Sequence, residues 1–372
     1  MFIGIDGNEA NINSRVGVGQ YAYHLLLSLH RLNHKHTFHI YLKSPPLPDM
    51  PPANPKWQYH IFGPTKLWTK IALPLHLYLR SDRLDLFFSP SHYSPHPSPS
   101  PTIPTIHDLG YLKTQSQFTK KDFYQLTTWT KQSLQHATHI IAVSEFTKND
   151  LITTYKIPAN KISVVYNGVS TPPPINPTTT KNTLQKFKIH NPYFLALGTL
   201  KPSKNYPFLI KSFSLYLQKH QSNQCLVIAG KKGWLFEEIF KTVTEENCPD
   251  RIIFTDYITE EEKWCLLKNT ISLVIPSTYE GFGIPAIESQ KIGTPVIAAN
   301  IAPLQEILDK SAIFVNPTQP ESLVQALFEV QKPTRRQQLI RLGTTKSAKF
   351  TWNNSALSLL SVFDSLSSAS PI

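Results

Sequence analysis

The 372-residue sequence is poor in cysteine, and this scarcity excludes several kinds of protein. Its three cysteines, Cys225, Cys248 and Cys265, are an odd number and form no C-x-x-C pair. A disulfide framework and a zinc ribbon both need paired, regularly spaced cysteines. We therefore expect reduced thiols, as in a cytoplasmic protein, and a fold stabilised by its hydrophobic cores.

Long hydrophobic runs are also missing. No apolar run reaches 18 residues, and the first residues, MFIGID, lack the basic and apolar regions of a signal peptide. We expect a cytoplasmic protein without a membrane-spanning helix. Residues 66–80 are apolar, include tryptophan and tyrosine, and have their cations mainly at the ends. This pattern favours a buried face, and the alternative is a helix lying on the anionic inner face of the membrane.

Acidic residues are outnumbered by basic ones, 25 against 37, and both halves of the chain share the net charge of +12. A general positive excess suits anionic ligands such as phosphates or acidic lipids, and it also serves solubility alone. There is no clustered basic run and no known nucleic-acid-binding motif, so nucleic acid is not an expected partner.

Short apolar segments alternate with longer amphipathic ones, which predicts an α/β fold of two doubly wound, Rossmann-like lobes facing a cleft. Segments such as CLVIA, 225–229, are apolar throughout, as are strands buried on both faces of a parallel sheet. The segment TPPPINP and the three threonines after it predict a linker without helix. The expected domains are a first Rossmann-like domain, 1–170, this linker, 171–190, a second Rossmann-like domain, 191–350, and a C-terminal helix returning to the first domain, 351–372.

The strongest motif is YEGFGIPAIE, 279–288, which follows a predicted strand and begins a predicted helix. Gly281 and Gly283 let the backbone approach a ligand closely, and the N–H groups at a helix start suit a phosphate. Glu280 and Glu288 carry carboxylates that can each accept two hydrogen bonds from a vicinal diol, such as a ribose or a hexose. The structural alternative is a capped helix start with two solvated acids.

This motif resembles the E-x7-E signature of retaining glycosyltransferases of the GT-B fold, in the large family 4 (glycosyltransferase group 1). The resemblance covers nearly the whole chain in family order, and its other segments are VSEFT at 143–147, YNGV at 166–169, ALGTL at 196–200 and GTPVIA at 293–298. It is greatest to the mannosyl- and rhamnosyltransferases of surface polysaccharides. It implies transfer of a sugar, with retention, from a nucleotide-sugar donor, GDP-mannose-like being favoured, to a glycan or lipid-linked acceptor.

The resemblance implies that the first domain is the acceptor side and that the second domain binds the nucleotide sugar. It also implies roles for single residues. Glu288 would hold the ribose, Glu280 the sugar, and Lys204 the phosphates. In the loop GTLKPSKN, 198–205, Ser203 stands where the family usually has an arginine, and Lys201 is a candidate to replace it. The implied donor-binding residues are Gly17, Gly19, Thr199, Lys204, Gly281, Phe282, Gly283 and Glu288.

His107 ends a predicted strand in the first lobe, and Asp108 beside it either orients the imidazole or faces away. The resemblance implies that His107 contacts the donor sugar near the reacting carbon, so His107 and Glu280 are the implied catalytic residues. Gly17 and Gly19 match G-x-G-x-x-A, but no acid lies between Glu9 and Asp49, which disfavours a nicotinamide cofactor. The family interpretation is a glycine-rich loop near the donor phosphates.

A metal or other cofactor is not expected, because the sequence contains no D-x-D cluster of carboxylates. The segment NHKHTFH, 33–39, has three histidines, but we expect it on a surface turn and not at a metal. No G-x-S-x-G motif and no P-loop occur. Two other functions stay open at this point: a nicotinamide-dependent sugar oxidoreductase, and a non-catalytic basic protein that binds glycan or nucleic acid.

Overall fold

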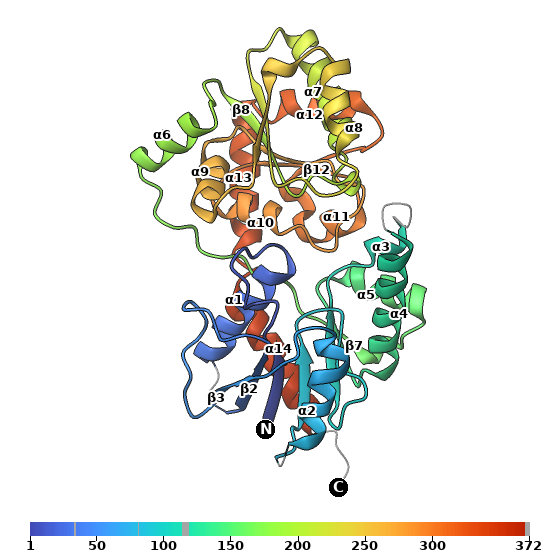
Figure 1. Ribbon diagram of the computed structural model, residues 1–372. Helices are drawn as coiled ribbons and strands as arrows, with labels where there is room; N and C mark the ends of the chain where they lie inside the picture. Colours follow the sequence, from blue (N-terminus) through green and yellow to red (C-terminus); the bar gives the residue numbers. More distant parts are fainter. Residues whose placement is uncertain (33–34, 81, 114–118, 369–372) are drawn as a thin grey trace. The chain divides into compact units, whose positions relative to one another are not determined.

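A computed structural model describes residues 1–32, 35–80, 82–113 and 119–368, and the chain in it forms two compact units (Figure 1). The first unit comprises residues 1–168 and 350–372, and the second comprises residues 169–349. The chain thus leaves the first unit after Gly168 and returns to it at Phe350.

The described part of the first unit contains a parallel sheet of seven strands in the order β3-β2-β1-β4-β5-β6-β7. Its central strands are apolar because helices cover both faces, and Ile3 and Ile5 of β1 are completely buried. The strands are β1 (Phe2–Asp6), β2 (Thr37–Leu42), β3 (Trp57–Ile61), β4 (Leu86–Ser89), β5 (Thr102–Ile106), β6 (Ile140–Ala142) and β7 (Ile162–Val164). The helices are α1 (Val18–Leu32), η1 (Trp68–Ala72), α2 (Leu73–Leu79), α3 (Gly110–Lys113), α4 (Lys120–His136), α5 (Glu145–Tyr155), η3 (Ala159–Lys161) and α14 (Trp352–Ser368).

The last helix, α14, packs against α1 within the first unit. The ring of Trp352 stacks on His24 at 5.3 Å between centroids, and the Ser355 hydroxyl donates a hydrogen bond of 2.6 Å to the Tyr166 carbonyl. A Cβ atom at Gly168 would lie 2.2 Å from the backbone nitrogen of Trp352, so only glycine permits this close approach.

The second unit contains a parallel sheet of six strands among its described residues, in the order β10-β9-β8-β11-β12-β13. The order reverses between β8 and β11, which is the topological switch point of a doubly wound sheet. The strands are β8 (Tyr193–Leu197), β9 (Cys225–Ala229), β10 (Ile252–Asp256), β11 (Leu273–Ile275), β12 (Val296–Ala299) and β13 (Ile313–Val315). The helices are α6 (Pro177–Lys186), η4 (Pro202–Lys204), α7 (Tyr206–His220), α8 (Glu237–Glu245), η5 (Pro249–Arg251), α9 (Glu260–Asn269), α10 (Ile284–Lys291), α11 (Ala302–Leu308), η6 (Asp309–Ser311), α12 (Pro320–Glu329) and α13 (Pro333–Ser347). The prediction of two doubly wound parallel sheets is confirmed.

The expectation that TPPPINP and the three threonines after it, residues 171–180, contain no helix is wrong, because α6 begins at Pro177. Proline is tolerated at the first helical position, where its missing N–H would have no partner in any case. The Asn176 side chain caps the helix by accepting a hydrogen bond of 2.7 Å from the Thr179 N–H. The threonines therefore continue a capped helix, and within 171–190 only the segments before Pro177 and after Lys186 are without regular structure.

The apolar segment 66–80 is divided into η1, a π-helical turn, and α2, with Pro74 in the first turn of α2. Its buried face packs in a cluster with Tyr41 and Phe87. The prediction that this segment is core is correct for that face alone, because its other face is exposed.

Candidate functional site

Two loops meet at the carboxyl edge of the second sheet, one on each side of the switch point. The first, 198–205, follows β8, and the second, 276–283, follows β11 and leads into α10. In doubly wound sheets, ligands bind outside the strand ends at this position. The topology therefore brings together two motifs that lie far apart in the sequence.

Hydrogen bonds between the two loops fix their relative position. The Thr278 N–H donates to the Ser203 carbonyl at 3.0 Å. The Asn205 side-chain amide donates to the carbonyls of Pro276 at 3.2 Å and Pro317 at 3.1 Å. Asn205 adopts a left-handed conformation with φ of 55°, which asparagine tolerates better than most residues. The residue that stands in place of the family's arginine, Ser203, thus holds the second loop through its backbone.

Lys204 and Glu280 form an ion pair of 2.6 Å between Nζ and Oε1, with side chains 17% and 14% exposed. The Ser277 hydroxyl donates to the same carboxylate oxygen at 2.7 Å. Tyr206, the first residue of α7, is buried and donates from its hydroxyl to the Gly198 carbonyl at 3.0 Å. Burial, with a smaller contribution from Glu280, raises the pKa of the Tyr206 hydroxyl far above its usual range, so it stays a neutral donor. Lys204 and Glu280, which are predicted from two separate motifs, therefore lie side by side in the structure.

The Gly-Phe-Gly segment presents its backbone and not its aromatic ring at the start of α10. Phe282 is only 4% exposed and belongs to the interior. Gly283 has a φ of 98°, and a Cβ atom there would lie 2.8 Å from Leu304 Cδ2. The backbone turn into α10 therefore needs glycine, and any contact of this segment with a ligand would come from main-chain atoms.

Glu288, on the first turns of α10, forms an ion pair that sequence reasoning missed. Its Oε1 accepts a hydrogen bond of 2.6 Å from Lys263 Nζ of α9, and Lys263 also pairs with Glu260 at 2.8 Å. Burial raises the pKa of the Glu288 carboxyl, and Lys263 opposes this shift. A cation next to a buried helical acid is expected on physical grounds, but no motif marks which lysine supplies it.

Two other residues of the second unit that were predicted from the sequence, Lys201 and Thr199, have different neighbours. Lys201 Nζ lies 5.3 Å from the ring centre of Trp234, in a cation–π arrangement. The methyl group of Thr199 lies so close to Gly233 that a Cβ atom there would be 2.7 Å away. The replacement of the family's arginine by Lys201 and the donor contact of Thr199 both stay predictions.

In the first unit, His107 directly follows β5 and is held by its neighbours. Its Nε2 lies 3.0 Å from the Pro90 carbonyl, and its ring meets Tyr21 edge-on at 4.6 Å. Burial, reinforced by His92, lowers the pKa of His107 to about 4, so the ring is neutral at pH 7. Asp108 accepts a hydrogen bond of 2.8 Å from the Gly110 N–H, which stabilises a local turn. Its role beside the imidazole of His107 stays a prediction.

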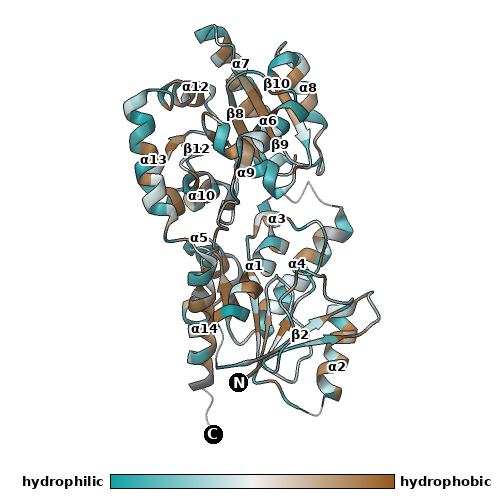
Figure 2. Ribbon diagram, turned by 90° about the vertical axis from the view of Figure 1, so that its left-hand side faces the viewer, coloured by the Kyte–Doolittle hydropathy of each residue, from teal (hydrophilic) through white to brown (hydrophobic). Residues whose placement is uncertain are grey.

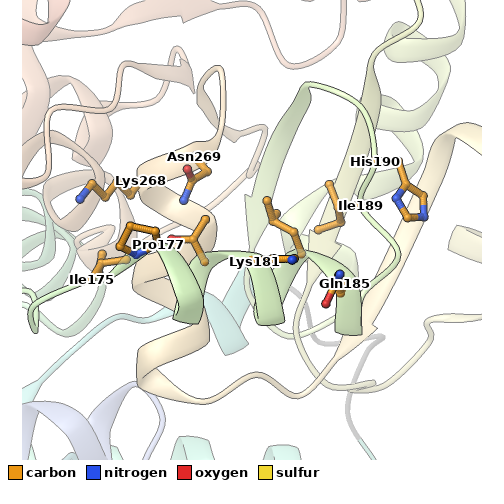
Figure 3. Close-up of a pocket in the computed structure, with 10 residues that line it drawn as sticks. Ile175, Pro177, Lys181, Gln185, Ile189, His190, Lys268 and Asn269 are labelled. Atoms are coloured by element: carbon orange, nitrogen blue, oxygen red, sulfur yellow. The ribbon is translucent and has the colours of Figure 1, made fainter.

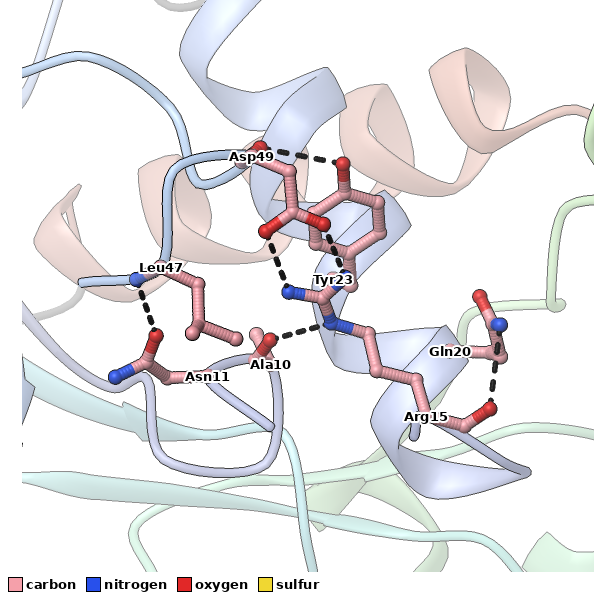
Figure 4. Close-up of polar contacts among 7 residues, drawn as sticks. All are labelled: Ala10, Asn11, Arg15, Gln20, Tyr23, Leu47 and Asp49. Carbon is pink, nitrogen blue, oxygen red and sulfur yellow. Dashed lines mark hydrogen bonds and ion pairs between the residues drawn. The ribbon is translucent and has the colours of Figure 1, made fainter. Parts of the chain in front are cut away.

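The glycine-rich loop before α1 is braced by Arg15 (Figure 4). The guanidinium binds Asp49 through two nitrogens, donates to the Ala10 carbonyl at 2.6 Å and lies 3.9 Å from the ring centre of Tyr23. Gly17 has a φ of 49°, and no atom lies within 4 Å of a Cβ built there. The space around Gly17 is open, as its predicted donor-binding role requires, and that role stays a prediction.

The histidines expected on a surface turn are buried where they are described. His36 is 2% exposed and pairs with Asp364 at 3.2 Å, and His39 is 3% exposed and contacts His60 at 2.9 Å. His34 lies outside the described residues. The surface-turn prediction is wrong because the chain enters β2 directly at Thr37. Within the described ranges, no group of three or more His, Cys, Asp or Glu side chains is arranged to hold a metal ion.

A separate hollow of about 530 Å³ lies beside α6 and the end of α9 (Figure 3). Apolar residues such as Ile175 and Leu184 line it together with the basic residues Lys181, His190 and Lys268, and none of its lining residues is acidic. No predicted site residue lines it.

The fold is that of known glycosyltransferases. Sucrose-phosphate synthase from Thermosynechococcus elongatus superposes with a TM-score of 0.75, at 19% identity, over 99% of this chain and 100% of that one. A glycosyltransferase from Rickettsia africae ESF-5 superposes with a TM-score of 0.72, at 15% identity, over 99% of each chain. These likenesses define the fold class.

The family follows from the sequence comparisons. Residues 16–172 match the model described as Glycosyltransferase Family 4, and residues 180–343 match the one described as Glycosyl transferases group 1. The chain belongs to this glycosyltransferase family, so the predicted family and enzyme class are confirmed. The oxidoreductase and the non-catalytic binding protein gain no support.

Two bacterial mannosyltransferases are among its relatives. O-antigen chain mannosyltransferase B of Escherichia coli is 25% identical over 74% of this chain and 73% of its own length. O-antigen chain mannosyltransferase RfbU of Salmonella typhimurium is 28% identical over 61% of this chain and 60% of its own.

Proposed function

We propose that this protein transfers a mannosyl residue from a nucleotide-sugar donor, GDP-mannose-like, to a hydroxyl of a glycan or lipid-linked acceptor, with retention, in the synthesis of a surface polysaccharide. The two O-antigen mannosyltransferase relatives support the sugar and the acceptor class. The observation that carries the proposal is the ion pair of Lys204 and Glu280 at the switch point of the second sheet, with Glu288 about one turn into the helix that follows.

The charges of this site suit a diphosphate and a sugar together. Without ligand, Lys204 and Glu280 neutralise each other at 2.6 Å. A donor diphosphate would draw Lys204 away and free the Glu280 carboxylate to accept hydrogen bonds from sugar hydroxyls. The N–H groups at the start of α10 and the positive end of its dipole would face the phosphates, and Glu288 would hold the ribose. Stabilisation of the departing diphosphate by these groups is the expected source of catalysis.

We propose that His107 acts as a neutral hydrogen-bonding group toward the donor sugar. With a pKa of about 4, its imidazole carries no charge at neutral pH. Its Nε2 faces the Pro90 carbonyl and is assigned the proton, which leaves Nδ1 as an acceptor. We propose further that no metal is needed, because Lys204 and the helix terminus supply positive charge at the phosphates.

A thermal-shift screen of GDP, UDP, ADP and dTDP and their sugar conjugates tests the donor. A ligand at 100 times its dissociation constant adds about 2.7 kcal/mol of stability. We expect GDP and GDP-mannose to give the largest shifts, with equal shifts in EDTA. If no nucleoside diphosphate raises the melting temperature, the proposed function is refuted; if UDP-sugars give the largest shift, the donor assignment is refuted.

We also propose that the protein contacts anionic membrane through the outer face of η1 and α2. Leu67, Ile71, Leu75, Tyr78 and Leu79 are 54–76% exposed. Their spacing places them on one side of a helix, and Figure 2 shows the hydrophobic residues along α2. No helix in the described ranges is long and apolar enough to cross a membrane. An apolar helix face on a protein of net charge +12 suits shallow binding to an acidic bilayer.

Liposome flotation tests this contact. We expect the protein to float with phosphatidylglycerol-containing vesicles at low salt and less with neutral phosphatidylcholine vesicles. A Leu75→Glu/Leu79→Glu variant should lose binding, whereas Leu357→Glu should keep it, because Leu357 is an equally exposed leucine, 53%, on α14. If the wild type does not float with acidic vesicles, this face is not a membrane surface.

A further inference from the structure

Lys263 occupies an unusual place for a lysine. It lies in the second turn of α9, whose N-terminus is already closed by a capping box of Thr259 and Glu262. The positive end of the helix dipole disfavours a cation there. Its side chain is nevertheless only 17% exposed. A buried cation at this position needs a compensating partner.

Two carboxylates supply the compensation. Lys263 Nζ lies 2.6 Å from Glu288 Oε1 and 2.8 Å from Glu260 Oε2. Although burial lowers the pKa of this lysine, the two acids outweigh burial and raise it. Lys263 is therefore charged at neutral pH, and its ammonium group is held by bonds in two directions.

The Glu288 carboxylate has a second oxygen, Oε2. Within the described part of the chain, its side chain is bonded to Lys263 through Oε1. Oε2 is not among the buried polar atoms without a partner, and 8% of the Glu288 side chain is exposed. The carboxylate is thus held by Lys263 through Oε1, which leaves Oε2 as the oxygen that a ligand would meet.

We propose that Lys263 is a positioning residue for donor binding: it fixes the Glu288 carboxylate through Oε1, so that Oε2 meets the vicinal diol of the donor ribose. This inference rests on the proposed function. A carboxylate already held in one rotamer loses less conformational entropy when it binds a diol. Lys263 acts through Glu288 and is not assigned a contact with the reacting atoms.

The charges around Glu288 make the ionisation of its carboxyl group depend on Lys263. From α9, Lys263 and Glu260 act on it with opposite effect. Two lysines on α10 and on α13, which packs against it, are engaged elsewhere: Lys291 donates to the Val169 carbonyl, and Lys346 donates to the Glu306 carbonyl. Without Lys263, the buried carboxyl would face Glu260 alone, and it would take up a proton more readily.

The test compares GDP with dGDP, and UDP with dUDP, as ligands in calorimetric titrations, because the deoxy forms lack one hydroxyl of the diol. A hydrogen bond to a charged group contributes about 1.5–3 kcal/mol, so we expect the wild type to prefer the ribose form by about 10-fold or more. Lys263→Met should reduce this preference to less than about 2-fold. Lys268→Met, an exposed lysine on the same helix, should leave it unchanged.

Two further effects distinguish a positioning role of Lys263 from a merely structural one. The preference of Lys263→Met for the ribose form should recover as pH rises, because Glu288 then loses its proton, and it should depend on pH more steeply than that of the wild type. In a Glu288→Gln background, Lys263→Met should change donor affinity no further. If Lys263→Met does not fold, Lys263→Gln, which keeps a hydrogen-bond donor without charge, should show the same pH-dependent loss.

The outcomes separate the two proposals. If the wild type binds neither GDP nor UDP, or does not distinguish them from their deoxy forms, the proposed site and the role of Lys263 both fail. If the wild type prefers the ribose form and the Lys263 variants keep that preference at every pH, only the positioning role is overturned.

Discussion

Replacing Lys204 by methionine tests the site most directly. The substitution removes the cation and keeps most of the side-chain volume. It leaves Glu280 at 14% exposure with the Ser277 hydroxyl as its remaining hydrogen-bond partner. We expect turnover of the donor to fall by about 100-fold or more, the typical loss when a group that stabilises transition-state charge is removed. Glu280→Ala should cause a loss of the same order.

The stability change should be smaller than the activity change. Loss of one partner from a partly buried ion pair is expected to cost about 1–3 kcal/mol, less than the 3–5 kcal/mol of a fully buried one. Thermal unfolding and steady-state turnover, measured on the same preparations, separate the two effects. A nucleoside diphosphate should also stabilise Lys204→Met much less than the wild type.

A surface ion pair in the same unit provides the matched control. Lys241 and Glu245 pair at 3.4 Å on α8, with side chains 76% and 50% exposed. Lys241→Met removes the same charge and should leave turnover unchanged, with at most about 0.5 kcal/mol lost. Wild-type rates in both Lys204→Met and Glu280→Ala would refute the assignment of this site.

The remaining predictions concern stability. His107 has a folded pKa of about 4 against an ordinary 6.5, so below pH 6.5 the unfolded state takes up its proton first and stability falls toward pH 4, by at most about 3 kcal/mol. Thermal unfolding against pH should show a shallower acid loss for His107→Gln, and an identical slope would contradict this. Asn176→Ala should cost about 1 kcal/mol by removing the cap of α6, and an unchanged melting temperature would show that α6 does not need it. Gly283→Ala should destabilise by more than 1 kcal/mol, since φ is 98° and the new methyl group would meet Leu304; a neutral effect would contradict the strained geometry.

The strands, the order of the motifs and their loop positions were predictable from the sequence. Apolar segments such as 225–229 have only one environment that suits them, a strand covered on both sides. The meeting of Lys204 with Glu280 follows from the same logic, because both come directly after strands of one parallel sheet.

The partners of individual side chains, the presence of short helices and the exposure of single helix faces were not predictable in this way. The partner of Glu288 comes from the face of another helix, and the spacing of residues along α9 does not indicate which lysine points inward. The proline-rich segment that looked like a linker contains α6 because one asparagine caps it. The exposure of one face of 66–80 depends on how the neighbouring strands fill the space below it, which the apolar pattern alone does not reveal.

The approach of Gly168 to Trp352 means that the second unit is an insertion in the first, with its entry and exit points side by side. During synthesis, the surface of α1 that receives α14 stays uncovered until residues 352–368 have left the ribosome, so the amino-terminal unit is finished last. The inserted unit, by contrast, has all its strands once residue 315 is made, and it can acquire its structure earlier although it comes later in the chain.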